Sequence, residues 1–197
     1  MLELKPTLTI VAGPNGSGKS TYTRAIRESL GVPVIDPDWE ARLVRPDAPQ
    51  AAAVEGGKQA IKRARAYLVN NQSFAAETTL AGKTYLRMMA EAKQNGWLIN
   101  LIYVGVASVE TSIDRVAQRV AQGGHNVPEE DIRRRYTRSL ANLPIAIELA
   151  DRATILDNST AAGHQPIAIV ENGRVVEQVR ELPEWIKTLL PEFIEEN

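Results

Sequence analysis

Apolar residues recur along the chain in short runs, and stretches of helical period separate these runs. Each run is rich in apolar or β-branched residues and is bounded by a turn signal, which predicts a strand. Strands are expected at residues 7–12, 32–35, 73–77, 97–106 and 153–157. The run at 97–106 is apolar on both faces, as is typical of a central strand in a covered sheet.

Helical periodicity fills most of the segments between these strands. The clearest helix follows Ser108, which suits an N-cap, and ends at Gly123-Gly124. A second begins at Pro128 and carries acidic residues in its first turn, where they complement the helix dipole. A hairpin turning at Asn172-Gly173 is predicted near the C-terminus. The remaining helices are expected at residues 20–30, 51–71, 83–95 and 185–190.

Strands that alternate with helices predict an α/β fold. We expect a parallel sheet of five strands flanked by helices, with the C-terminal hairpin at its edge. A length of 197 residues fits a single domain that spans residues 1–197.

Composition narrows the class of protein. A net charge of -1 argues against bulk attraction to nucleic acid or to an anionic membrane, and the absence of cysteine excludes disulfides and thiolate metal sites. The N-terminus enters a strand pattern at once without the pattern of a signal peptide, and no apolar run is long enough to span a membrane. We therefore expect a soluble cytoplasmic protein.

One motif carries a strong chemical signal. Residues 13–20 read GPNGSGKS, which matches the phosphate-binding loop, or P-loop, pattern G-x-x-x-x-G-K-[ST], and they lie between a predicted strand and a helix. Lys19 is expected to reach the β- and γ-phosphates of ATP, and Ser20 to bind Mg²⁺. The predicted nucleotide-binding residues are Gly13, Pro14, Asn15, Gly16, Ser17, Gly18, Lys19, Ser20 and Thr21.

Three carboxylates follow predicted strands. Asp36 and Asp38 come after the second strand and Glu77 ends the third, and such positions face the ligand crevice of an open α/β sheet. A kinase needs a carboxylate there to accept the proton of an acceptor hydroxyl, which Asp36 or Asp38 could supply, and Glu77 could bind a substrate hydroxyl or a magnesium-bound water. The alternative is structural, with an Asp-Pro-Asp turn and an exposed glutamate.

Arginines are concentrated in the two helices that flank the GGHNVP loop. Arg115 and Arg119 are spaced i, i+4, and further arginines follow at 133–135 and 138. We expect residues of about 109–140 to form a helical lid in which at least one of these arginines stabilises the transferring phosphoryl group, while His125 could touch a phosphate or cap the loop. The alternative for each single arginine is a solvated surface with ion pairs inside the helix.

The order of GPNGSGKST, IDPD, ETTL, DRVAQRVAQGGHNVPEEDIRRRYTRSLANL and LDNS resembles the zeta-toxin-like P-loop kinases, in particular a bacterial branch often labelled predicted ATPase. The resemblance covers residues 7–160 and implies an adenylate-kinase-like core that uses ATP and Mg²⁺. It implies a general base at Asp38, a substrate-positioning acid at Glu77 and a phosphate contact from Arg115 or Arg119. Zeta toxins phosphorylate UDP-N-acetylglucosamine and are commonly blocked by an antitoxin, so the resemblance implies a similar acceptor and partner.

Two functions therefore stay open. The first is an ATP-dependent small-molecule kinase of the zeta toxin type. The second is a nucleotide-binding regulatory ATPase or switch with no acceptor other than water. A base at Asp38 distinguishes the two, because a switch would not need one there.

Overall fold

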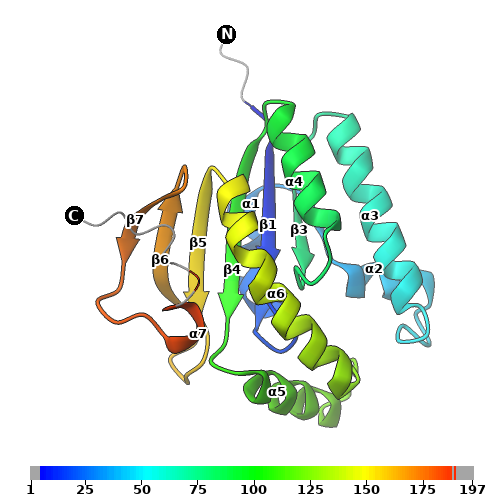
Figure 1. Ribbon diagram of the computed structural model, residues 1–197. Coiled ribbons are helices and arrows are strands. Elements are labelled where there is room, and N and C mark those ends of the chain that lie inside the picture. Colours follow the sequence, from blue (N-terminus) through cyan, green and yellow to red (C-terminus); the bar gives the residue numbers. More distant parts are fainter. Residues whose placement is uncertain (1–4, 188, 190–197) are drawn as a thin grey trace.

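The computed structural model describes residues 5–187 and 189. Its centre is one mixed sheet of seven strands in the order β2-β3-β1-β4-β5-β6-β7 (Figure 1). The first five strands in this order, β2, β3, β1, β4 and β5, pair in parallel. Strand β6 pairs antiparallel with both β5 and β7. The expected parallel sheet of five strands is therefore only part of a larger mixed sheet that the hairpin completes. The strands are β1 (Thr7–Ala12), β2 (Val34–Ile35), β3 (Phe74–Thr78), β4 (Leu98–Gly105), β5 (Arg152–Asp157), β6 (Gln165–Glu171) and β7 (Arg174–Gln178).

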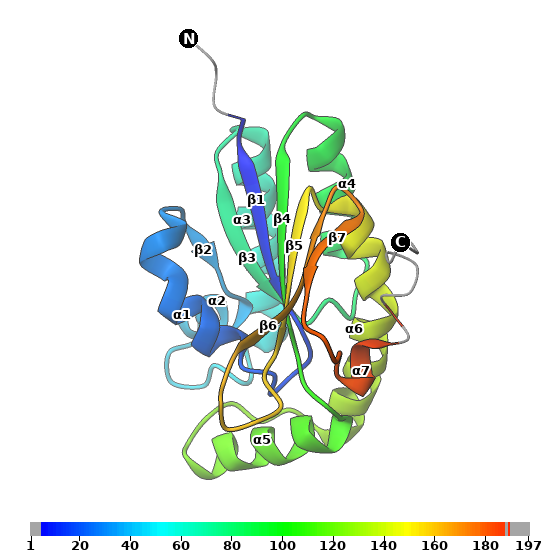
Figure 2. The same cartoon turned by 90° about the vertical axis from the view of Figure 1, so that its left-hand side faces the viewer.

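Helices cover both faces of this sheet. Figures 1 and 2 show α4 and α6 on one face, α1 on the other, and α5 across the end toward which the parallel strands run. No helix in the described part of the chain is long and apolar enough to cross a membrane. The helices are α1 (Lys19–Leu30), α2 (Pro37–Val44), α3 (Ala53–Val69), α4 (Thr84–Gln94), α5 (Val109–Ala121), α6 (Glu129–Leu149) and α7 (Glu184–Lys187).

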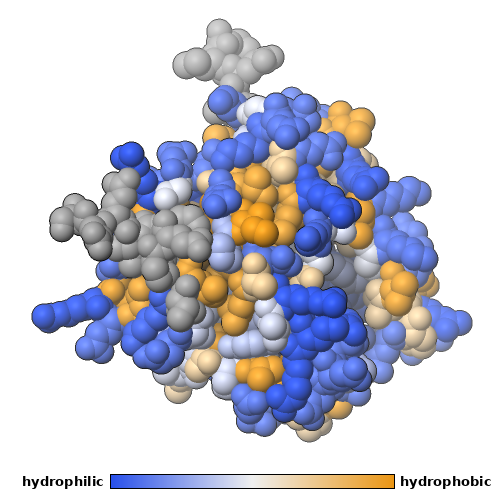
Figure 3. Space-filling model, viewed as in Figure 1, coloured by the Kyte–Doolittle hydropathy of each residue, from blue (hydrophilic) through white to orange (hydrophobic). Residues whose placement is uncertain are grey.

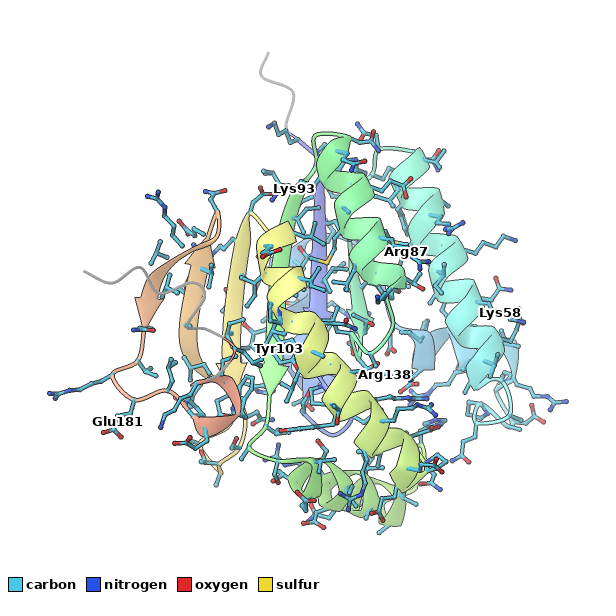
Figure 4. The ribbon with its side chains drawn as sticks, viewed as in Figure 1. Lys58, Arg87, Lys93, Tyr103, Arg138 and Glu181 are labelled. Carbon is cyan, nitrogen blue, oxygen red and sulfur yellow. The ribbon has the colours of Figure 1, made fainter. Side chains whose placement is uncertain are left out.

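The core forms where β1, β3 and β4 meet α4 and α6. Fully buried side chains include Ile10, Phe74 and Leu101, and β4 is buried along most of its length, as its apolar sequence predicts. The Tyr103 hydroxyl of β4 lies 2.9 Å from the Ser139 hydroxyl of α6, in a buried contact between the two elements (Figure 4). This contact fixes the middle of α6 to the sheet.

Helix α2 was not expected from the sequence, which suggested only a turn at this point. The Asp36 side chain caps it by accepting a hydrogen bond from the Asp38 amide at 2.9 Å, and Pro37 occupies its first turn. Its other support is distant in sequence. A Cβ added to Gly56 of α3 would lie 2.6 Å from the Ala41 amide nitrogen, so the two helices approach at a glycine.

The C-terminal part follows the prediction where it is described. The hairpin turns at Asn172 and Gly173, whose φ angles of 50° and 79° suit the tight turn expected from Asn-Gly. The last helix among the described residues is α7 (Glu184–Lys187). The predicted continuation to residue 190 includes positions 188 and 190, which lie outside the described residues.

Candidate active site

The P-loop joins β1 to α1 in a conformation that requires glycine. Gly13 has a φ of 140°, and a Cβ at this position would lie 2.1 Å from the Val104 carbonyl oxygen. Gly18 has a φ of 94° at the start of α1. Left-handed glycines at both ends let the backbone amides turn inward, at the positive end of a helix, and this arrangement suits a phosphate.

A cavity of about 710 Å³ opens beside the P-loop, between the first turns of α2 and α3 and the loop that joins α5 to α6. It brings together Lys19, Ser20, Asp38, Glu77 and Arg119, which come from four separate segments of the chain. The lining residues are Asn15, Gly16, Lys19, Ser20, Asp36, Pro37, Asp38, Gln50, Ala53, Val54, Gly57, Glu77, Thr78, Thr79, Arg119, His125, Asn126, Val127, Pro128, Asp131 and Arg135.

The Lys19 side chain folds back onto the backbone of its own P-loop. Its Nζ donates a hydrogen bond to the Pro14 carbonyl oxygen at 2.7 Å. Burial lowers the pKa of Lys19 from 10.5 to about 8, although the charges of Glu77 and Asp38 act in the opposite direction. The ammonium group is therefore poised to gain stability from a triphosphate.

This lowered pKa predicts proton uptake when nucleotide binds. At pH 8 roughly half of the Lys19 side chains are neutral, and a bound triphosphate favours the ammonium form. Binding of Mg·ATP is therefore expected to take up about 0.5 proton at pH 8 and almost none at pH 6, so affinity falls as the pH rises above 8. Calorimetry in two buffers of different ionisation enthalpy measures the uptake. Lys19→Ala should remove it, and equal uptake in that variant would contradict the assignment.

Ser20 and Glu77 meet beside the P-loop. The Ser20 hydroxyl donates to Glu77 Oε2 at 2.8 Å, and Glu77 is only 6% exposed. Burial raises the pKa of Glu77, and the nearby charge of Asp36 raises it further. A hydroxyl and a carboxylate at one point are the hard oxygen donors that suit Mg²⁺, which takes few protein ligands and completes its shell with phosphate and water.

The two aspartates after β2 take different places. Asp36 caps α2, and burial raises the pKa of its carboxyl group. Asp38 lies in the first turn of α2 and lines the cavity opposite the P-loop. The structural alternative therefore describes Asp36, whereas the position of Asp38 suits contact with an acceptor.

The two candidate lid arginines, Arg115 and Arg119, also take different places. Arg119 lines the cavity, and its Nη2 donates to the His125 carbonyl oxygen at 2.7 Å. Its Nε is buried and has no hydrogen-bond partner among the described residues, so it keeps a donor for a ligand. Arg115 is absent from the cavity lining and lies against the P-loop, with its Cβ 3.4 Å from the point that a Cβ on Gly16 would occupy. Of the i, i+4 pair, Arg119 therefore faces the cavity.

Most arginines of α6 pair with nearby acids. Figure 3 shows hydrophilic side chains over the N-terminal half of this helix. Arg133 bridges Glu110 and Glu129 at 3.0 and 2.8 Å, and Arg134 pairs with Asp131 at 2.6 Å. Arg135 lies 3.7 Å from the same aspartate and is the member of this basic run that lines the cavity. The solvated-surface alternative therefore fits Arg133 and Arg134.

The segment after Glu77 contains a strained residue. Leu80 is fully buried at a φ of 58°, a left-handed conformation that costs a non-glycine residue about 1 kcal/mol. The Thr78 hydroxyl accepts a hydrogen bond from the Leu80 amide at 3.0 Å, and Asn142 Nδ2 of α6 donates to the Leu80 carbonyl at 2.8 Å. Helix α6 thus holds the turn that directs Thr78 and Thr79 into the cavity.

Removal of this contact should destabilise the fold. Asn142→Ala leaves the Leu80 carbonyl without its buried donor, and we expect the free energy of unfolding to fall by about 1–3 kcal/mol. Urea denaturation measures this change. Asn95→Ala, at an exposed position at the end of α4, should change it by less than about 0.5 kcal/mol. An equal effect of the two substitutions would contradict the role given to Asn142.

Two residues that contact the P-loop were not predicted. Asn158 and His164 lie in the segment after β5 and bond to the carbonyl oxygens of Ser17 and Gly18. The available signal was the position of Asn158 at the end of a parallel strand, on the ligand side of the sheet. No pattern marked His164.

The sequence pattern of a family described as an AAA domain matches residues 8–141. This match runs from β1 through the P-loop and α5 into α6 and covers more than half of the chain. The chain belongs to this AAA domain family. An uncharacterized protein of Haemophilus influenzae is 35% identical to it over 124 residues, which make up 63% of this chain and 88% of that protein.

Solved structures share the fold of this AAA domain at low sequence identity. A candidate kinase of Chloroflexus aurantiacus aligns with a TM-score of 0.54 at 21% identity, over 68% of this chain and 80% of its own. The AvrRxo1-ORF1:ORF2 complex with ATP aligns with a TM-score of 0.67 at 17% identity, over 88% of this chain and 60% of that one. The PezAT toxin-antitoxin system of Streptococcus pneumoniae aligns with a TM-score of 0.56 at 14% sequence identity, over 85% of this chain and 72% of that one. The chain thus has an α/β P-loop kinase-like fold.

Proposed function

We propose that the protein is a phosphotransferase that moves the γ-phosphoryl group of ATP to a hydroxyl group of a small molecule. One observation carries this proposal: Lys19, Asp38 and Arg119 line the same cavity from three different elements. A cation in the P-loop, a carboxylate opposite it and an arginine from the lid side are the groups that phosphoryl transfer to a hydroxyl requires.

Each group has a part in the reaction. The P-loop and Lys19 hold the phosphates of ATP, and Ser20 with Glu77 would hold Mg²⁺, which neutralises charge on the phosphates. Asp38 accepts the proton of the acceptor hydroxyl while that oxygen forms a bond to the γ-phosphorus. The bond between this phosphorus and the β,γ-bridging oxygen breaks, and ADP leaves with the electron pair. Arg119 stabilises the charge on the transferring group.

The finer assignment is a kinase of the zeta toxin type that acts on a UDP-activated amino sugar such as UDP-N-acetylglucosamine. Its support is the order of motifs in the sequence and the likeness of fold to a toxin-antitoxin system and to a two-protein complex that was solved with ATP. An antitoxin-like protein is the partner that these likenesses suggest.

Mass spectrometry tests the proposal directly. Purified protein is incubated with Mg·ATP and a panel of nucleotide sugars and other metabolites, and Asp38→Ala is incubated in parallel. A product that gains one phosphoryl group with the unchanged protein alone would establish the kinase and identify its acceptor. ATP hydrolysis without transfer, at a rate that Asp38→Ala leaves unchanged, would favour the regulatory ATPase.

We further propose that closure over the γ-phosphate is confined to the loop at residues 122–128, because α5 already lies against Gly16 of the P-loop and is bridged to α6 by the Arg133–Glu110 ion pair. The part of the expected lid that belongs to α6 is tied to β4 by the buried Tyr103–Ser139 contact, and the Tyr136 hydroxyl donates to the Val106 carbonyl at 3.0 Å. Such closure would exclude water from the cavity and limit futile hydrolysis.

Arg119 is expected to act mainly in the transition state. Arg119→Ala should lower kcat for phosphoryl transfer by about 100-fold and change the affinity for ATP by less than about threefold. Arg115→Ala should lower kcat much less, because Arg115 does not line the cavity. Steady-state kinetics and ATP titration compare the two variants. A matching loss of ATP affinity in Arg119→Ala would show that Arg119 mainly binds the ground state.

A further inference from the structure

The segment that follows β5 lies against the outer side of the P-loop. Asn158 Nδ2 donates to the Ser17 carbonyl oxygen at 2.8 Å, and His164 Nε2 lies 3.1 Å from the Gly18 carbonyl oxygen. The backbone amide of Asn158 donates to the Gly105 carbonyl at 2.9 Å, which fixes this residue to the end of β4. Two side chains from more than 130 residues away thus contact consecutive peptide groups of the P-loop.

Contacts with these carbonyls determine where the adjacent amides point. A trans peptide group is planar, and its carbonyl and N–H bonds point in opposite directions. A donor that holds the Ser17 carbonyl outward therefore turns the Gly18 N–H toward the inside of the loop. A donor on the Gly18 carbonyl does the same for the Lys19 N–H. These are amides with which a P-loop surrounds a phosphate.

The local geometry favours this arrangement. The partner of His164 Nε2 is a carbonyl, which can only accept, so this nitrogen carries the proton. The imidazole ring lies 5.2 Å from the ring of Tyr22 on α1, and this contact restricts its orientation. A Cβ on Gly18 would lie 2.4 Å from Asn158 Nδ2 and 3.0 Å from His164 Nε2, so both side chains need a glycine at this position.

We propose that Asn158 and His164 are positioning residues that orient the phosphate-binding amides of the P-loop and do not contact the base. This inference rests on the proposed ATP site. It predicts that both residues contribute to the affinity for any ligand that contains a triphosphate, with or without a base and ribose attached. A residue that contacted the adenine base would contribute only to the affinity for ATP.

Calorimetric titration of the whole chain with Mg·ATP and with magnesium tripolyphosphate tests this prediction. Asn158→Ala is expected to weaken the binding of both ligands by the same factor of about 10, which corresponds to one lost hydrogen bond. His164→Ala should weaken both by about threefold to tenfold. His164→Gln keeps an N–H donor and should restore both affinities to within about threefold of the unchanged protein. Asn95→Ala, at the exposed end of α4, serves as the control, and thermal unfolding checks that each variant is folded.

Two outcomes would overturn the proposal. A loss of ATP affinity with unchanged tripolyphosphate affinity would mean that the side chains contact the base or ribose. Unchanged affinity for both ligands would mean that the contacts have no effect on phosphate binding. If Asn158→Ala does not fold, the comparison of His164→Ala with His164→Gln decides between these outcomes.

The outcome of these binding titrations can be distinguished from the outcome of the phosphoryl-transfer experiment. An unchanged protein that bound neither ligand would overturn the ATP site and this inference together. If it binds both ligands but phosphorylates no acceptor, the kinase assignment fails, and the titrations of the variants still decide the role of Asn158 and His164.

Discussion

Lys19→Ala is expected to cause the largest loss of function in this protein, with phosphoryl transfer reduced by about 1,000-fold and ATP binding weakened by at least tenfold. The reason is that Lys19 is the cation at the point where the β- and γ-phosphates would lie. It is already half-buried and partly desolvated, so its interaction with the phosphates is screened less than it would be in bulk water. Single-turnover kinetics and a fluorescent ATP analogue measure the two effects separately.

The matched control is Lys58→Ala. Lys58 lies on α3 with a side chain that is 70% exposed and points away from the sheet, and its substitution should leave transfer and binding unchanged (Figure 4). The stability of Lys19→Ala should equal or exceed that of the unchanged protein, because the substitution removes a cation that is partly desolvated in the folded state. A Lys19→Ala protein that retained transfer within tenfold would place the reacting phosphate elsewhere and would remove the basis of the proposed site.

Some parts of this site could be predicted from sequence because their signals are local. The P-loop lies in eight consecutive residues between a strand and a helix, and its function depends on backbone conformations that only those residue types adopt. The position of Glu77 follows from the length of β3, since strand ends share one edge of a parallel sheet. Here periodicity and chain order contain the necessary information.

Other parts depend on contacts between distant segments. Arg115 and Arg119 look equivalent in the sequence because they share one face of α5, and only the placement of this helix along the P-loop puts Arg115 beside Gly16 and Arg119 in the cavity lining. Helix α2 is eight residues long and is supported by packing on Gly56 and by the Arg63–Glu40 ion pair with α3, which no local propensity reports. Asn158 donates to a residue 141 positions away, so its place in LDNS at the end of a strand did not specify this contact.

The second large effect is expected at Asp38. Asp38→Asn should lower phosphoryl transfer by about 100-fold to 10,000-fold, because the amide cannot accept the proton that the acceptor hydroxyl loses. The affinity for Mg·ATP should change by less than about threefold, since Asp38 lies opposite the P-loop and its carboxylate does not bind the nucleotide in the proposed reaction. Rapid-quench measurement of the product, with ATP titration of the same preparation, gives both quantities.

Asp36 provides the informative comparison, because it lies two residues away and also lines the cavity. Its carboxylate caps α2, so Asp36→Ala should lower the free energy of unfolding by about 1 kcal/mol, whereas Asp38→Asn should leave stability nearly unchanged. Both substitutions remove one negative charge from the cavity, so a general electrostatic effect on ATP would appear in both. If transfer depends on a base, the loss in Asp38→Asn is far larger than the loss in Asp36→Ala and is not accompanied by unfolding. Equal losses in the two variants would show that the position of α2, and not proton transfer to Asp38, limits the reaction.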